Sequence, residues 1–293
     1  MMRPLMTTHI APTQSTPSFK GQSSPASRSQ KGLSLVEVMV AMAIGLFIVL
    51  LVSLVYIEGA RNLSFRQGQS ENLANSRYTL GSLEQHFSKA GYRRDPTLSM
   101  EKAFPALIDD TTDCAFARGE AINIKTDGAL CIRFQPRDAI ETDCSGNTDP
   151  SVSSLMPYEA PTTSTVGNGV FVERFSISNH TLVCAAQSTE TALAAGVQDI
   201  HFQYGTGPKV SSMAIRKISA FTTDTPSSNQ VIRALKYSIL LAASSSRLTG
   251  GMESTVCDRW KTVAGADNAS CSADSGALYQ VASGAVTLRN LMP

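Results

Sequence analysis

The chain has 293 residues and is close to neutral, with 25 basic and 24 acidic side chains and a formal net charge of +1. This balance gives no reason to expect a nucleic-acid partner, which calls for a clearly basic surface. Hydrophobic residues make up 42% of the chain, so a sizeable core can form.

Residues 1–32 form a basic leader. They contain no acidic residue and four basic ones, Arg3, Lys20, Arg28 and Lys31. Their Ser, Thr, Pro and Gln content predicts disorder, because such a segment cannot bury a core. Positive charge ahead of an apolar segment predicts an N-terminus in the cytoplasm. Removing the leader would leave 261 residues (293 minus 32) with a net charge of −3 (+1 minus 4).

The segment that follows runs from Lys31-Gly32-Leu33-Ser34-Leu35-Val36-Glu37 into apolar residues that reach Ile57. Val38 to Ile57 are twenty residues without a charge, enough for a helix to cross about 30 Å of hydrocarbon. An unpaired Glu37 would cost roughly 2.5–3.5 kcal/mol at the bilayer centre. A carboxylate in this position therefore indicates a function.

Two simpler interpretations fit less well. Ala41-Met42-Ala43 could be the cleavage site of a secretory signal, but a signal core has only about 7–15 apolar residues, and here the apolar residues continue to Ile57. A plain membrane anchor explains the length of the segment, but neither Gly32 nor Glu37.

The arrangement of Gly32, Glu37 and the apolar segment resembles the type III signal of type IV prepilins and type II secretion pseudopilins. The resemblance implies that a prepilin peptidase cuts after Gly32 on the cytoplasmic side and N-methylates Leu33. Leu33 replaces the phenylalanine that most members of the family carry. The new amine has a reference pKa of about 7.7–8.0 and is largely cationic at neutral pH. Pairing it with Glu37 of a neighbouring subunit would remove two unpaired charges and set the axial stagger of a filament. The alternative is that Glu37 reaches the lipid headgroups.

Helical periodicity continues beyond the apolar segment. Gly91 is a plausible stop and Pro96 prevents much further extension. A helix from Leu33 to Ala90 would have 58 residues and a length of about 87 Å. Gly59 and Gly68 weaken its middle, so a local melt from Glu58 to Gly68 is the alternative. The apolar stripe consists of Leu73, Leu80, Leu83, Phe87 and Ala90.

Beyond Thr97 the sequence predicts short strands separated by polar loops, with no internal repeat. The predicted strands are Ala121–Lys125, Leu130–Phe134, Val170–Ser176, Thr181–Ala185, Val197–Tyr204, Met213–Ala220, Val231–Leu241 and Leu278–Arg289. The predicted loops are Ser145–Asn168, Thr222–Gln230 and Ser244–Gly251.

Several later segments are similar to PilW-type minor pilins. They are Asn72-Leu73-Ala74-Asn75-Ser76-Arg77-Tyr78, Phe87-Ser88-Lys89-Ala90-Gly91-Tyr92-Arg93, Asp143-Cys144-Ser145-Gly146, Gly196-Val197-Gln198-Asp199-Ile200 leading to Tyr204-Gly205, and Val286-Thr287-Leu288-Arg289-Asn290. The resemblance implies an α+β, pilin-like lollipop, in which a long N-terminal transmembrane helix packs on an antiparallel β-sheet domain. The expected parts are the leader 1–32, a transmembrane and filament-core helix 33–57, its amphipathic continuation 58–91 and a disulfide-bonded head 92–293.

All six cysteines follow the apolar segment, and no C-x-x-C occurs. An even number in an exported domain predicts disulfides formed in an oxidising periplasm, and six cysteines allow 15 pairings. We expect Cys114–Cys131 and Cys257–Cys271 as short closures, with separations of 17 and 14 residues. The family-like segment around Cys144 implies the third pair, Cys144–Cys184.

No catalytic motif is present, so we expect no enzyme and no cofactor. His86 is expected on the polar side of the helix, His180 and His201 in strand-like runs, and Trp260 in the core. Two acidic groups, Asp109/Asp110/Asp113 and Asp138/Glu141/Asp143, lack the spacing of an EF-hand, so solvated loops are favoured over a calcium site.

The resemblance implies a minor pilin that initiates a type IV pilus, first in the inner membrane with a periplasmic head and then at the pilus tip. The implied partners are the prepilin peptidase, other minor pilins, the major pilin, the assembly ATPase and platform, and a tip adhesin. Two alternatives remain. One is a type II secretion pseudopilin; the other is a tip module whose loops, such as Ser145–Asn168, bind a surface ligand or DNA.

Overall fold

The computed structural model describes residues 32–209, 217–227, 229–245, 248–249, 255–264, 271 and 276–292. The chain divides into two compact units, with the boundary between Val55 and Tyr56. Helix α1 (Leu35–Phe87) begins in the first unit and ends in the second.

Helix α1 is continuous over 53 residues, so the alternative of a melt from Glu58 to Gly68 is wrong. Gly68 serves close packing instead, because a Cβ there would lie 2.6 Å from the Leu248 side chain. The helix ends at Phe87, three residues earlier than expected. A short turn then leads to Gly91, whose positive φ of 72° favours glycine.

The second unit contains two larger sheets. One has six strands in the order β3-β4-β6-β7-β8, with β5 pairing to β6; the other has four in the order β10-β9-β11-β12. Among the described strands, pairing is antiparallel except between β5 and β6. The first sheet comprises β3 (Ile122–Ile124), β4 (Leu130–Phe134), β5 (Thr165–Val166), β6 (Gly169–Ser178), β7 (Thr181–Ala186) and β8 (Thr189–Ala195). The second comprises β9 (Val197–Pro208), β10 (Ala220–Thr222), β11 (Gln230–Ala242) and β12 (Tyr279–Thr287).

Smaller elements complete the unit. They are helix α2 (Met100–Ala103), the hairpin of β1 (Leu107–Asp109) and β2 (Cys114–Phe116), the 3-10 turns η1 (Pro150–Val152) and η3 (Arg289–Leu291), and helix α3 (Thr255–Ala264). Seven of the eight predicted strands coincide with described strands. The eighth, Met213–Ala220, lies largely outside the described residues. Strand β10 begins at Ala220, the last residue of this predicted strand, and ends at Thr222, the first residue of the predicted loop.

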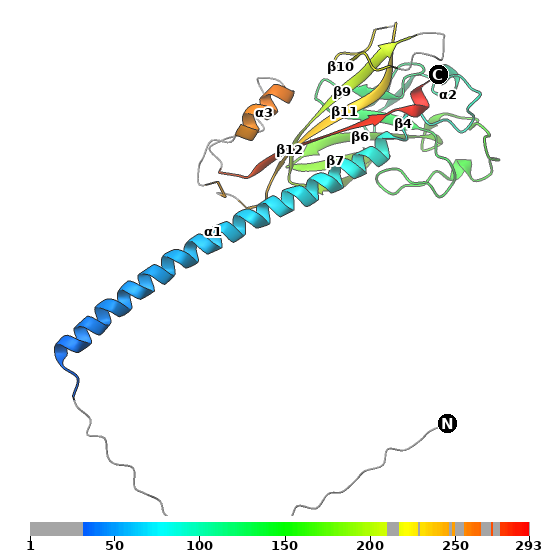
Figure 1. Cartoon of the computed structure of the whole chain (residues 1–293). Helices are drawn as coiled ribbons and strands as arrows, with labels where there is room; N and C mark the ends of the chain where they lie inside the picture. Colours follow the sequence, from blue (N-terminus) through cyan, green and yellow to red (C-terminus); the bar gives the residue numbers. More distant parts are fainter. Residues whose placement is uncertain are drawn as a thin grey trace, which may run out of the picture. The chain divides into compact units, whose positions relative to one another are not determined.

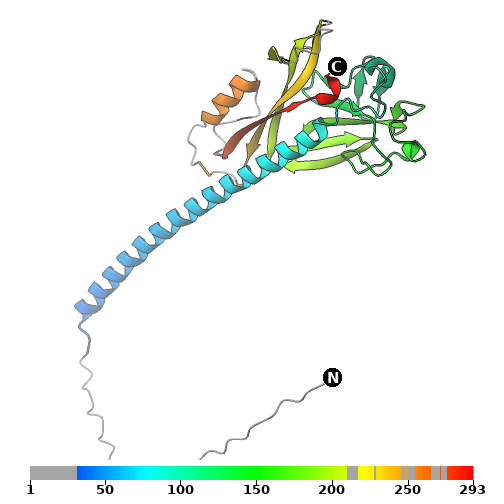
Figure 2. The same ribbon diagram turned by 45° about the vertical axis from the view of Figure 1, so that its right-hand side comes forward.

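The core lies where the C-terminal part of α1 meets both sheets (Figures 1 and 2). Phe87 is fully buried and makes edge-on ring contacts with Phe175 of β6, Phe202 of β9 and Tyr237 of β11 at 5.1, 5.9 and 5.3 Å. Tyr237 also donates its hydroxyl to the Leu80 carbonyl at 3.3 Å. The expected α+β fold, a long N-terminal helix followed by antiparallel sheets, is therefore confirmed.

Candidate processing and assembly site

The junction of Gly32 and Leu33 lies just before α1. Both residues are exposed and outside regular structure, and Leu33 retains 73% of its accessible surface. The helix is started by the Ser34 carbonyl, which accepts the backbone N–H groups of Glu37 and Val38 at 3.0 and 3.2 Å. A peptidase would therefore meet the bond after Gly32 in accessible, non-helical chain. The leader, up to Lys31, lies outside the described residues.

Glu37 is exposed in the first turn of α1. A carboxylate there is favoured by the partial positive charge of the helix N-terminus. From Val38 to Ile57 the large apolar side chains keep 42% or more of their surface exposed. Helix α1 is the one described helix that is long and apolar enough to cross a membrane. The Ala41-Met42-Ala43 segment lies inside this helix, where extended chain for a signal peptidase is absent.

Two side-chain contacts hold the C-terminal end of α1 and the turn that follows it. His86 Nδ1 lies 3.0 Å from Oε2 of Glu173, a fully buried residue of β6. Lys89 Nζ lies 3.3 Å from the Glu141 carboxylate. A buried carboxylate is costly without a partner, so His86 has a structural role. Its expected place on the polar side of the helix is wrong, because the ring turns toward the head and contacts Phe175.

The C-terminus of the chain caps the same helix end. Asn290 Nδ2 donates to the carbonyls of Ser88 and Ala90 at 3.0 and 3.3 Å and lies 3.5 Å from that of Lys89. These carbonyls belong to the turn that follows α1, where the Lys89 carbonyl also accepts the backbone N–H of Tyr92 at 2.9 Å. The family-like segments at Ala90 and Asn290 are thus in direct contact, although 200 residues separate them.

The segment Ser145–Asn168 is more ordered than the long exposed loop that was expected. It contains η1 and β5, and the fully buried Asp149 accepts the backbone N–H groups of Ser151 and Gly169. The buried guanidinium of Arg94 donates to the Pro136 carbonyl, before the segment, and to the Met156 carbonyl within it. Side chains from outside the segment therefore hold it in place.

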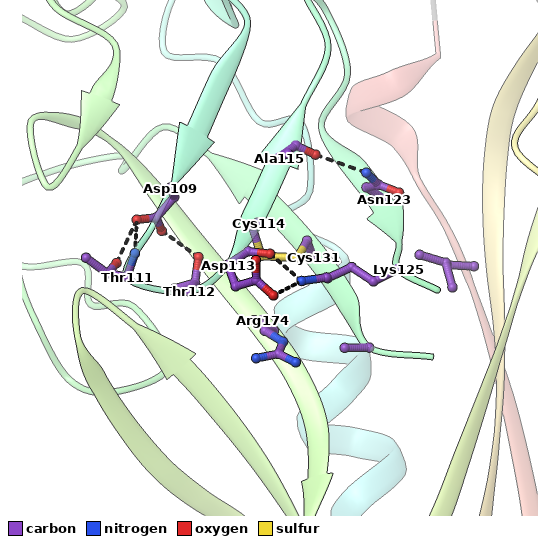
Figure 3. Close-up of a disulfide and its surroundings, with 12 residues drawn as sticks. Asp109, Thr111, Thr112, Asp113, Cys114, Ala115, Asn123, Lys125, Cys131 and Arg174 are labelled. Atoms are coloured by element: carbon purple, nitrogen blue, oxygen red, sulfur yellow. Dashed lines mark hydrogen bonds and ion pairs between the residues drawn. A yellow bond between two sulfur atoms is a disulfide. The ribbon is translucent and has the colours of Figure 1, made fainter. Parts of the chain in front are cut away.

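Three disulfides close the head: Cys114–Cys131, Cys144–Cys184 and Cys257–Cys271. These are the three pairs expected from the sequence. The first joins β2 to β4 (Figure 3). The sulfurs of the second lie within 4.8 Å of the Glu173 carboxylate, but they are bonded to each other and are not available to a metal ion.

Removing both cysteines of the Cys144–Cys184 pair should be the most damaging of the three double replacements. In the chain-entropy model the stabilisation grows with loop size, and this pair closes the longest loop, with a separation of 40 residues. We expect Cys144→Ser with Cys184→Ser to lower the free energy of unfolding by about 2–5 kcal/mol. Non-reducing peptide mapping of the wild type checks the pairing. A peptide linking Cys114 to Cys271 would contradict it.

The acidic groups considered for calcium make local hydrogen bonds. Asp109 accepts the hydroxyls of Thr111 and Thr112, and Asp113 pairs with Lys125 (Figure 3). The pKa of Asp113 is lowered, first by the hydrogen bond from Lys125 and then by its charge. In the second group, the nearly buried Asp143 accepts the backbone N–H groups of residues 145 and 147. Asp109 and Asp143 therefore shape turns, which corrects the expectation of purely solvated loops.

The remaining candidate residues take structural positions. His180 has a positive φ of 58° in the turn between β6 and β7, so its expected place in a strand is wrong. His201 lies in β9, where burial lowers its pKa. Trp260 is fully buried, as expected, and donates Nε1 to Asp199 Oδ2 at 3.1 Å. Burial also raises the pKa of Tyr204 to about 12.

The fold and this site define a class: a protein with an apolar N-terminal helix suited to a membrane and a disulfide-bonded, antiparallel β-rich head. Residues 27–53 match the family model described as the prokaryotic N-terminal methylation motif. The matched segment contains Gly32, Leu33 and Glu37, and it supports a type IV pilin-like protein that is made as a prepilin. Proteins of this kind are structural, membrane-anchored subunits that are processed by a prepilin peptidase. No curated protein matches the sequence.

Proposed function

We propose that this protein is a PilW-like minor pilin that helps to initiate a type IV pilus and remains in its tip complex. The prepilin peptidase cuts between Gly32 and Leu33 and methylates the amine of Leu33. The subunit then leaves the inner membrane and joins other minor pilins beneath a tip adhesin. Its role is assembly through protein contacts, without catalysis.

The observation that carries the proposal is the exposed Glu37, the fifth residue after the cleavage junction, on an otherwise uncharged helical segment. In a bilayer this carboxylate needs a partner. The amine of a neighbouring subunit's Leu33 is a suitable one. The pairing would also set the stagger between helices.

The assignment to a PilW-like minor pilin is supported by the placement of its family-like segments. The Ala90-Gly91 turn after α1 is capped by Asn290, and Cys144 of the third segment is bonded to Cys184 of β7. The family-like Gly196 has a positive φ of 77° and leads directly into β9. Each segment therefore occupies a structurally demanding position, at a cap, a disulfide or a turn.

Processing tests the proposal directly. Mass spectrometry of protein from sheared pili should find an N-terminal N-methyl-leucine at Leu33, because the junction is exposed and the motif is complete. The chain retained in a strain without the peptidase should keep residues 1–32. An intact leader in assembled pili, or a terminus after Ala43, would contradict the assignment.

A deletion strain separates the pilus from the secretion pseudopilus. A minor pilin predicts the loss of surface pili with normal protein secretion, and a pseudopilin predicts the reverse. Complementation with the wild-type gene should restore the lost trait and serves as the control.

A further inference from the structure

Among the described strands, β12 is an edge of the four-stranded sheet. It pairs with β11 over nine residues, from Ala242↔Tyr279 to Ala234↔Thr287, without a register shift. On its other side, no backbone hydrogen bond joins Val281–Thr287 to another described residue. The strand also lacks the charged residues, proline and bulges by which edges commonly prevent further pairing. It is therefore able to accept another strand.

A rigidly held helix packs on the sheet over the first part of this strand. Figures 1 and 2 both show α3 next to the first part of β12. The helix is fixed by the Cys257–Cys271 disulfide and by fully buried Trp260, which packs with Leu240 and Val281 of the sheet. A surface held in this way loses little conformational entropy when a ligand binds.

Between α3 and β12 is a cleft of about 350 Å³, lined by Thr255, Val256, Arg259, Tyr279, Gln280 and Val281. Successive side chains of a strand point to opposite faces of the sheet. The cleft touches three consecutive residues at the start of β12, so it reaches both faces of the strand there and adjoins Val281, where an added strand would begin. Its volume is at the lower end of the range for ligand pockets, so it suits one side chain rather than a large ligand.

The charge of this groove is positive. Arg259 is the one charged residue among those lining the cleft; it is exposed and forms no ion pair with another described residue. Val256 and Val281 supply apolar surface beside it. A guanidinium is well suited to hold a carboxylate through two parallel hydrogen bonds.

We propose that the groove between α3 and β12 binds an extended peptide segment of a partner protein that carries a carboxylate. The segment adds as a strand along Val281–Thr287, places an apolar side chain in the cleft and sets its carboxylate against Arg259. Main-chain hydrogen bonds supply affinity in this mode of recognition, and the side-chain pocket supplies specificity. The inference does not depend on the pilus assignment, because it concerns the chemistry of a partner and not the machine that the subunit joins.

The test uses the full chain in detergent micelles and a phage library of random heptapeptides with free carboxyl termini. Selected peptides should lack proline at central positions and carry a terminal or side-chain carboxylate next to a β-branched or aromatic residue. A fluorescent copy of the best peptide should bind Arg259→Gln about tenfold more weakly, since one charge-assisted contact is lost. Lys261→Gln is the matched control on the same helix and should bind normally, because Lys261 does not line the cleft.

Hydrogen exchange locates the bound peptide independently of any substitution. The peptide should slow exchange of alternate amides in Val281–Thr287 and leave those of Ala220–Thr222, at the other edge of the sheet, unchanged. Failure to select peptides above the level seen with Arg259→Gln would overturn the proposal. So would protection at Ala220–Thr222 instead. A dimer in which the free protein already protects Val281–Thr287 would replace the partner peptide with a second copy of this chain.

Discussion

Glu37→Leu is expected to reduce incorporation of the subunit into pili by about tenfold or more, which corresponds to ~1.4 kcal/mol of lost pairing. The change removes the exposed carboxylate from the first turn of α1 and leaves the Leu33 amine of a neighbour without a partner. The protein should remain in the membrane, because a costly charge is gone. Cleavage should persist, because Gly32 and the apolar flank are intact. The measurement is complementation of a deletion strain, scoring membrane level, processing and sheared pili together.

The matched control is Glu58→Leu, the same replacement on the same helix beyond the apolar segment. Glu58 is exposed and accepts only a weak contact from Asn62 at 3.4 Å, so assembly should be close to normal. Normal pili containing the Glu37→Leu subunit at wild-type amounts would remove the proposed pairing. Glu37 would then be a residue that reaches the lipid headgroups.

Phe87→Ala should lower the free energy of unfolding of the head by about 3–5 kcal/mol, the usual cost of deleting a large buried aromatic side chain. Phe87 is fully buried at the meeting point of α1 and both sheets, where it contacts Phe175, Phe202 and Tyr237. The cavity left by alanine would open the core shared by these elements. Denaturant unfolding of the full chain in micelles, followed by the fluorescence of Trp260, measures the change.

Tyr78→Ala on the same helix provides the comparison. Tyr78 keeps 62% of its surface exposed, so its loss should change stability by less than about 0.5 kcal/mol. Equal losses from the two variants would mean that the end of α1 does not depend on the aromatic cluster.

The sequence was sufficient to predict α1 and most of the sheet. Of the predicted apolar stripe, Leu80, Leu83, Phe87 and Ala90 are turned to the core, whereas Leu73 keeps 45% of its surface exposed. Strands such as β4 and β11 are rich in apolar residues, with aromatic and β-branched side chains among them, which is typical of strands. The elements that were missed have weaker local signals. Strand β8 is rich in alanine, and the turn before it has positive φ at Gln187 and Ser188 instead of at a glycine.

The candidate site divides in the same way. The junction at Gly32 and Glu37 is a local pattern, so a short stretch of sequence contains all of it. The contact between His86 and Glu173 joins residues 87 positions apart, and no local pattern indicates which buried carboxylate a helix will meet. The groove beside β12 is equally non-local, because Arg259 and Val281 become neighbours only after α3 folds onto the sheet.

The cap that Asn290 places on the turn after α1 has a consequence for the timing of folding. Ser88 leaves the ribosome 202 residues before the side chain that caps it. A domain closed by contacts of such high sequence separation folds slowly and cannot be completed while its last residues are still in transit. The head therefore stays unfinished until Asn290 has been synthesised. Asn290 then acts as a checkpoint, since a chain truncated before it would leave the turn after α1 without its cap.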